Sequence, residues 1–179
     1  VKILTVSGHL PPLYTRKEYE TTVDEAKKAY EILGVNDYTF MEIPATFIGD
    51  EPVSKLNGLF SSYFKEFEPN IVLCPFPDRH IDHRIIFDGG VVACRPIKKS
   101  FPKAVLLYET LSETHWNVPG VEASFNPDFF VDISDELKVK INALSCYDSQ
   151  IKDNPSRSLQ ACESLAKFRG SQNGCDFAE

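Results

Sequence analysis

The chain has 179 residues, 42% of them hydrophobic and 25% charged, and a formal net charge of -7 at pH 7. A chain of this length and composition can bury a sizeable core, so one globular α/β domain over residues 1–179 is expected. The acidic balance argues against nucleic acid or a membrane surface as a partner. No apolar run approaches the roughly 20 residues that a membrane span requires.

The five cysteines are odd in number and widely spaced, and no Cys-x-x-Cys pair occurs. This pattern is not typical of a zinc ribbon or of a thioredoxin-like redox site. Reduced, buried thiols in a cytoplasmic protein are the expected interpretation.

Apolar runs and turn residues predict strands that alternate with helices. Strands are expected over residues 1–6, 38–42, 71–74, 104–108 and 129–133. Helices are expected over residues 20–33, 53–67, 85–94, 134–147 and 155–169, and Thr15 and Glu18 have the spacing of a capping box. The alternation and the nearly continuous apolar strands favour a mainly parallel sheet, with helices covering both faces.

The most informative segment runs from Asp78 to Arg84 and follows the apolar run 71–74. In open α/β sheets, ligands bind outside the carboxyl ends of the strands. His80 and His83 are three residues apart and can share one face of a helical turn. One imidazole could then hold a metal ion while the other addresses a substrate, although this spacing alone is more often a surface feature.

Four other residues have two interpretations each. Asp78 and Arg79 either line the rim of a pocket, where Arg79 would bind substrate, or form a solvated turn with a local ion pair. His9, in a Gly-His-Leu-Pro-Pro loop, either contacts substrate or is a turn residue. Trp116 either offers an apolar face to a sugar ring or covers the core.

A series of short motifs extends the pattern over nearly all of the chain. In order, they are Leu33-Gly34-Val35, Glu68-Pro69-Asn70-Ile71-Val72, the segment from Asp78 to Arg84, Phe125-Asn126-Pro127, Val131-Asp132-Ile133-Ser134, Lys140, Ala143-Leu144, Ser149-Gln150, Arg169-Gly170 and Ala178-Glu179. Their order and spacing resemble the PIG-L/LmbE-like family of zinc-dependent N-acetyl-sugar deacetylases. The resemblance implies a Rossmann-like α/β fold and hydrolysis of the acetamide of a small-molecule amino sugar.

The resemblance also implies roles for the central residues. His83 would be a zinc ligand, and His80 would protonate the departing amine or stabilise the oxyanion. Asp82 would hold an imidazole by hydrogen bonding and so fix its tautomer.

The sequence departs from the family pattern in two places. The family opens with a strand and a His-Pro-Asp-Asp-type motif, which supplies two metal ligands and the general base, and no segment here matches it. Residues 1–7 resemble the second strand of the family, so the first strand–helix unit is expected to be missing, and both chain ends look truncated. Thr22 stands where many relatives carry an Arg three residues before the equivalent of Glu25, and Arg16 is a candidate substitute.

The leading hypothesis is therefore a zinc-dependent amide hydrolase. The alternative is an inactive relative that acts as a sugar-binding or scaffold protein. Nucleotide binding ranks last because the sequence contains no Gly-x-Gly-x-x-Gly fingerprint. The sequence leaves the oligomeric state open, a homo-oligomer included.

Overall fold

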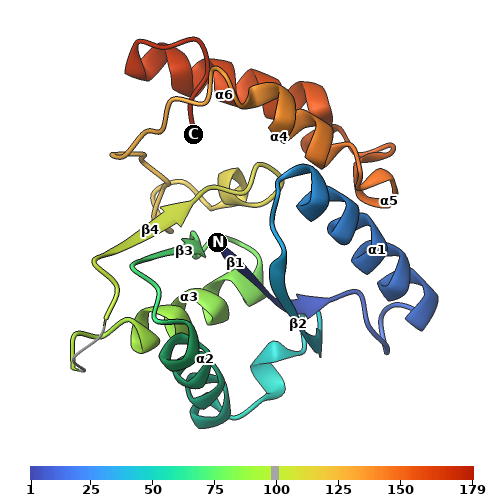
Figure 1. Cartoon of the computed structure of the whole chain (residues 1–179), viewed down its shortest axis with the longest axis vertical. Helices are drawn as coiled ribbons and strands as arrows, with labels where there is room; N and C mark the ends of the chain where they lie inside the picture. The colour runs from blue at the N-terminus through green and yellow to red at the C-terminus, as the bar shows by residue number, and fades with distance from the viewer. Residues whose placement is uncertain (98–100) are drawn as a thin grey trace. The chain divides into compact units, whose positions relative to one another are not determined.

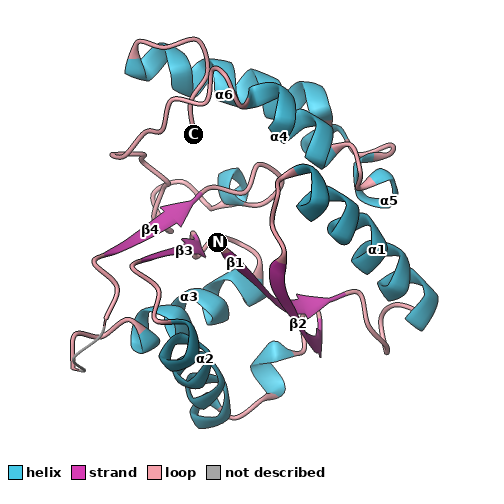
Figure 2. Ribbon diagram, viewed as in Figure 1, coloured by secondary structure: helices cyan, strands magenta, loops and turns pink. Residues whose placement is uncertain are grey.

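The computed structural model describes residues 1–97 and 101–179 as a mixed α/β protein (Figures 1 and 2). Contacts between Cα atoms divide the chain into two compact units. Residues 1–42 and 126–179 form unit 1, and residues 43–125 form unit 2. Within the described ranges, no helix is both long and apolar enough to cross a membrane.

Unit 1 begins with β1 (Lys2–Gly8), which pairs with β2 (Asp37–Pro44) in a two-stranded sheet. Between the strands lies α1 (Arg16–Ile32), which starts at the predicted capping box. Thr15 Oγ1 accepts the Glu18 amide at 3.2 Å, and Glu18 Oε2 accepts the Thr15 amide at 2.7 Å. The helix starts four residues earlier than the apolar pattern suggested, because the capping bonds and not the buried face set its first turn.

The other helices of unit 1 are α4 (Leu137–Leu144), the short α5 (Asp148–Ile151) and α6 (Leu159–Asn173), with a 3-10 turn at Pro155–Arg157. Ile133, Leu137 and Ala166 form a buried apolar cluster between α4 and α6. The buried carboxylate of Glu25 joins α1 to the start of α5, since it accepts the Ser149 amide at 2.8 Å and the Ser149 hydroxyl at 2.6 Å.

The strand predicted over residues 129–133 is wrong. These residues form only an isolated antiparallel bridge between Asp132 and Ala178. The partner segment is 177–179, in which Phe177 and Glu179 accept the amides of Ile133 and Val131. Two backbone pairs of this kind are too few to make a strand.

Unit 2 contains β3 (Ile71–Pro75) and β4 (Ala104–Tyr108), which pair in parallel from Ile71 opposite Ala104 to Pro75 opposite Tyr108. The helices are α2 (Val53–Phe67) and α3 (Ile81–Ala93), with 3-10 turns at Ile48–Asp50 and Thr114–Trp116. The predicted bounds of α2 and β4 are confirmed. Because the two strands are parallel, their carboxyl ends and the loops that follow them lie at one edge of the sheet.

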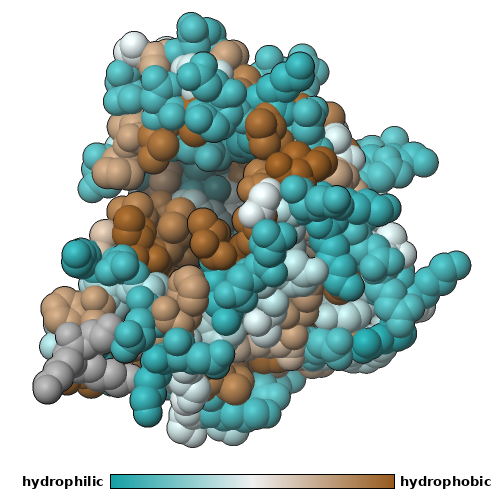
Figure 3. All heavy atoms as spheres, in the orientation of Figure 1, coloured by the Kyte–Doolittle hydropathy of each residue, from teal (hydrophilic) through white to brown (hydrophobic). Residues whose placement is uncertain are grey.

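The expectation of strands buried on both faces is wrong for β3. Val72 and Cys74 are buried in a cluster with Cys94 and Phe64, whereas Ile71 and Leu73 are 55% and 63% exposed. Figure 3 shows apolar atoms at the surface over β3 and β4. Helix α3 packs on β3 within this unit, so alternate side chains of the strand meet helix and solvent.

Two glycines of α3 allow close packing in the core of unit 2. A Cβ atom at Gly89 would lie 2.6 Å from the ring of Phe60 in α2, and one at Gly90 would lie 2.9 Å from Cys74 Sγ in β3. Real Cβ atoms do not approach other heavy atoms so closely. Because glycine has no side chain, α3 can lie this close to α2 and β3.

We predict that Gly89→Ala destabilises the protein by about 1–3 kcal/mol, because the added methyl group overpacks the contact with Phe60. Urea unfolding measures the change. Gly58→Ala in α2 is the matched control: its Cβ meets nothing within 4 Å, so it should stabilise by roughly 0.5–1 kcal/mol. Equal stabilities of the two variants would contradict the close contact between α2 and α3.

Candidate active site

The histidine segment lies at the carboxyl end of β3, as predicted, and its local geometry starts with a helix cap. His80 is the N-cap of α3, and its Nδ1 accepts the backbone amide of Asp82 at 3.2 Å. A side-chain acceptor at this position satisfies one of the amides that have no partner in the first turn. His83 follows in that first turn, and the two imidazole rings stack with centroids 4.8 Å apart and an interplanar angle of 24°.

The carboxylate of Asp78 organises this segment. Asp78 is 0% exposed, and its oxygens accept the His83 Nδ1–H at 2.9 and 3.0 Å and the His80 amide at 2.9 Å. The hydroxyl of Thr114, in the loop after β4, donates to the same carboxylate at 2.9 Å. A buried carboxylate requires such donors, and here they come from the segments that follow both strands.

The hydrogen bonds assign opposite tautomers to the two stacked rings. Nδ1 of His83 faces a carboxylate and carries the proton, which leaves a lone pair on Nε2 for a metal ion. Nδ1 of His80 accepts an amide, so its proton is on Nε2. One ring therefore offers a ligand atom and its neighbour offers an N–H donor.

Asp78 is the residue whose importance sequence reasoning missed. The alternative of a solvated turn is wrong, because its carboxylate is fully buried. Its bond to the His80 amide, two residues on, is the local Asx pattern, which the sequence could have suggested. Its bond to Thr114 spans 36 residues and has no local signal.

Asp82 is also buried, at 1% exposed, and both of its oxygens accept the backbone amide of Thr46 at 3.1 Å. Thr46 has a φ of 69°, in the left-handed region that a non-glycine residue rarely adopts. The carboxylate thus holds a strained turn of the loop before α2. The imidazole-orienting contact described above belongs to Asp78, and the role of Asp82 toward an imidazole stays a prediction.

Arg79 and Arg84 converge on one carboxylate, that of Glu122. Their guanidinium groups donate to Glu122 Oε1 at 2.9 and 2.6 Å, and the Val118 amide donates to Oε2 at 2.8 Å. Arg84 Nε also donates to the carbonyl of Asp78. The Val118 amide and then the two guanidinium groups lower the pKa of Glu122 to about 2. Arg79, a predicted substrate contact, is thus next to His80 and paired with an anion.

The two remaining candidates lie in different units. Trp116 ends the 3-10 turn of unit 2 and is 67% exposed, which contradicts the interpretation that it covers the core. His9 belongs to unit 1, where it stacks on Tyr14 with ring centroids 4.1 Å apart. Burial and then the charge of Arg157 lower the pKa of His9, while Glu18 acts in the opposite sense. The neutral imidazole is therefore favoured near pH 7.

The next question is whether the described side chains could hold the predicted zinc ion. Among residues 1–97 and 101–179, no group of three or more His, Cys, Asp or Glu side chains is placed to hold a metal. A catalytic zinc site takes three protein ligands. His83 has the chemistry of one of them, and the described residues do not complete the set.

Comparisons with known proteins point to a deacetylase family. The family model for PIG-L, GlcNAc-PI de-N-acetylase, matches residues 7–94. The chain is also 26% identical over 188 aligned positions to diacetylchitobiose deacetylase of Thermococcus kodakarensis. That match covers 97% of this chain but only 64% of the relative's length. The two matches support assigning the chain to the PIG-L/LmbE-like deacetylase family.

Three solved structures share the fold. A conserved protein of Thermus thermophilus has a TM-score of 0.76 at 23% identity, with 99% of this chain and 78% of that chain covered. The N,N'-diacetylchitobiose deacetylase of Pyrococcus horikoshii has a TM-score of 0.72 at 17% identity, with 100% and 70% covered. The 4-carboxy-2-hydroxymuconate hydratase of Pseudomonas putida has a TM-score of 0.72 at 15% identity, with 99% and 93% covered. Since the fold also occurs in a hydratase, the reaction must be argued from the site.

We predict that Asp78→Asn destabilises the protein by about 1–3 kcal/mol, because the new amide NH₂ cannot accept the hydrogen bonds that the lost oxygen accepted. The imidazole ¹⁵N shifts of His83 should also report a change from a single tautomer to a mixture. Asp88→Asn, on the exposed side of the same helix, is the control and should stay within roughly 0.5 kcal/mol of the parent. Unchanged shifts in the Asp78 variant would contradict its orienting role.

A second prediction concerns pH. The pKa of Glu122 is lowered from an ordinary 4.5 to about 2, so the folded state favours its carboxylate. Its stabilising contribution is complete above pH 4.5 and disappears as the pH falls toward 2. The difference in Tm between the parent and Glu122→Gln should therefore shrink over this interval, whereas Glu66→Gln, an exposed control, should show no such trend. A constant difference for Glu122→Gln would refute the ion-pair assignment.

Proposed function

We propose that this protein is a zinc-dependent N-deacetylase that removes the acetyl group from an N-acetylated amino sugar or its conjugate. The observation that carries the proposal is the pair of stacked imidazoles with opposite tautomers, His83 with a free Nε2 lone pair and His80 with an Nε2–H donor. The match to the PIG-L family model and the similarity to diacetylchitobiose deacetylase support it.

The reaction cleaves the amide C–N bond with water and yields acetate and a free amine. When bound, zinc acts as a Lewis acid and lowers the pKa of a water molecule to about 7. His83 would hold the ion through Nε2, with Asp78 behind it. The other ligands and the general base are expected from a His-Pro-Asp-Asp-type motif, as the family pattern implies.

His80 would act on the substrate side. Its Nε2–H can donate a hydrogen bond to the oxygen that becomes negatively charged, or give its proton to the departing amine. The Asp82 amide keeps Nδ1 as an acceptor, so the ring presents its proton on the correct atom. Arg79, His9 and Trp116 are proposed as substrate contacts, and Asp82 as a support of the catalytic histidine.

We place this site in one deacetylase domain with a Rossmann-like sheet, and the whole protein in the cytoplasm. The five cysteines are free thiols, which supports a reducing compartment. An inactive sugar-binding relative is less well supported. The buried carboxylate of Asp78 holds the proton of His83 on Nδ1 and so leaves Nε2 free. A metal ligand needs this arrangement, whereas sugar binding alone does not.

The test is acetate release by the full-length protein from N-acetylglucosamine and diacetylchitobiose, together with its metal content. We expect His83→Ala to lose most of the metal and the activity. His80→Asn should retain the metal and the helix cap, because Asn is a good N-cap, but lose at least 100-fold in kcat, on the order of a general-acid contribution.

His80→Ala separates the two roles of this residue, since it should lose the cap as well, at about 1 kcal/mol. His115→Asn, a partly exposed histidine of the same unit bonded to Glu109, is the matched control and should behave like the parent. If His80→Asn and His83→Ala both released acetate at the parental rate, the assignment of this site would be wrong.

A further inference from the structure

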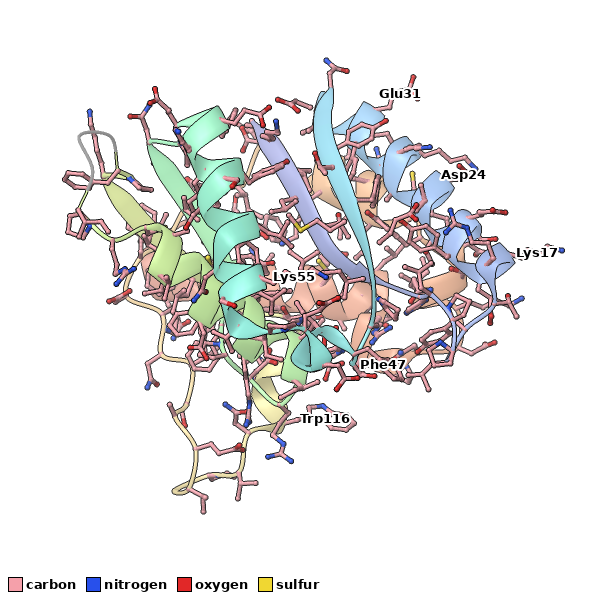
Figure 4. The ribbon with its side chains drawn as sticks, turned by 90° about the horizontal axis from the view of Figure 1, so that it is seen from below. Lys17, Asp24, Glu31, Phe47, Lys55 and Trp116 are labelled. Carbon is pink, nitrogen blue, oxygen red and sulfur yellow. The ribbon has the colours of Figure 1, made fainter. Side chains whose placement is uncertain are left out.

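The segment 116–121 has an unusual surface. Its sequence, Trp-Asn-Val-Pro-Gly-Val, contains no charged side chain. Trp116, Val118 and Val121 are 67%, 46% and 80% exposed, and Figure 4 shows Trp116 on the outside of the molecule. Neighbouring apolar side chains that remain in water in an otherwise acidic protein commonly mark a binding surface.

Residues on both sides of this segment are hydrogen-bonded to the histidine segment. On one side, Thr114 donates to Asp78. On the other side, Glu122 accepts from Arg79 and Arg84. Asp78 and Arg79 directly precede His80, so the apolar segment is held next to the proposed reaction site.

The nearby charges are already matched. Arg79 and Arg84 both donate to Glu122, whose carboxylate also accepts the Val118 amide. The amide nitrogen of Asn117 donates to the carbonyl of Ala123. The segment therefore offers apolar contact area in preference to the paired hydrogen bonds that sugar hydroxyls or a phosphate require.

We propose that residues 116–121 form a binding loop for an apolar aglycone, an alkyl or aryl group carried by the N-acetylated amino sugar. This inference rests on the proposed function and names the substrate class. The acetamide would reach His80 while the aglycone lies against Trp116 and the two valines. The preferred substrate is then an apolar conjugate, and a free sugar is a poor one.

The kinetic test compares octyl and methyl N-acetyl-β-glucosaminides with the full-length protein below the micelle concentration. We expect a higher kcat/KM for acetate release from the octyl compound. Val121→Asp should lower the octyl-to-methyl ratio of kcat/KM by about 5-fold or more, because it removes apolar contact and introduces a charge. Val53→Ser in α2, where the parent side chain is 72% exposed, is the matched control and should leave the ratio unchanged.

A second readout does not depend on turnover. Trp116 is the only tryptophan of these 179 residues, so its fluorescence reports on contact with the loop. The octyl glucosaminide should shift the emission of Trp116 to the blue, and the methyl compound should not. The Trp116→Phe variant should lose this signal, which would assign it to Trp116. A shift without acetate release would support the loop and contradict the proposed function. Release at equal kcat/KM without a shift would overturn the loop alone.

A membrane surface is the competing partner for an exposed Trp–Val loop. Neutral phosphatidylcholine vesicles test it directly. A blue shift with vesicles but none with the octyl glucosaminide would overturn the aglycone proposal in favour of contact with lipid. A shift with the glucosaminide and none with vesicles is the result we expect.

Discussion

The buried carboxylate of Asp78 is the interaction on which the rest of unit 2 depends. A carboxylate with no access to water is costly unless donors surround it, and these come from His83, His80 and Thr114. Each donor fixes something different: the proton position on a ring, the backbone at the start of α3, and the loop after β4. Loss of the carboxylate would therefore disturb all three together.

Parallel pairing of β3 with β4 explains why these donors can meet. The strands are in register up to Pro75 and Tyr108, and the next amide, that of Phe76, still donates to the Tyr108 carbonyl at 3.0 Å. Both strands therefore end at the same edge of the sheet. The residues that follow, though more than 30 positions apart in sequence, are within hydrogen-bonding distance.

Local signals in the sequence were sufficient for much of the fold. The capping box of α1 and the bounds of α2 and β4 follow from short-range patterns, and they are confirmed. The strand over residues 129–133 could not be judged in this way, because pairing depends on a partner that lies 46 residues further along the chain. The alternating exposure of β3 likewise depends on which faces α3 covers.

In the candidate site too, local features could be predicted from the sequence and long-range contacts could not. The position of the histidine segment after β3 was predictable, because strand, turn and helix are adjacent in sequence. The different roles of the Asp78 and Asp82 carboxylates were not predictable. Asp78 and Asp82 are both near the histidines in sequence, and their long-range partners, Thr114 and Thr46, have no local signal.

The contact between Gly90 and Cys74 has a consequence for redox chemistry. Burial raises the pKa of the Cys74 thiol to about 11, so little thiolate exists at neutral pH and oxidants react with it slowly. On the side of α3 the sulfur lies close to the helix, since a Cβ atom at Gly90 would be 2.9 Å from it. An oxygen added on that side would push on α3, the helix that His80 caps and that contains His83. Oxidative damage at this thiol would therefore disturb the candidate site without modifying a histidine.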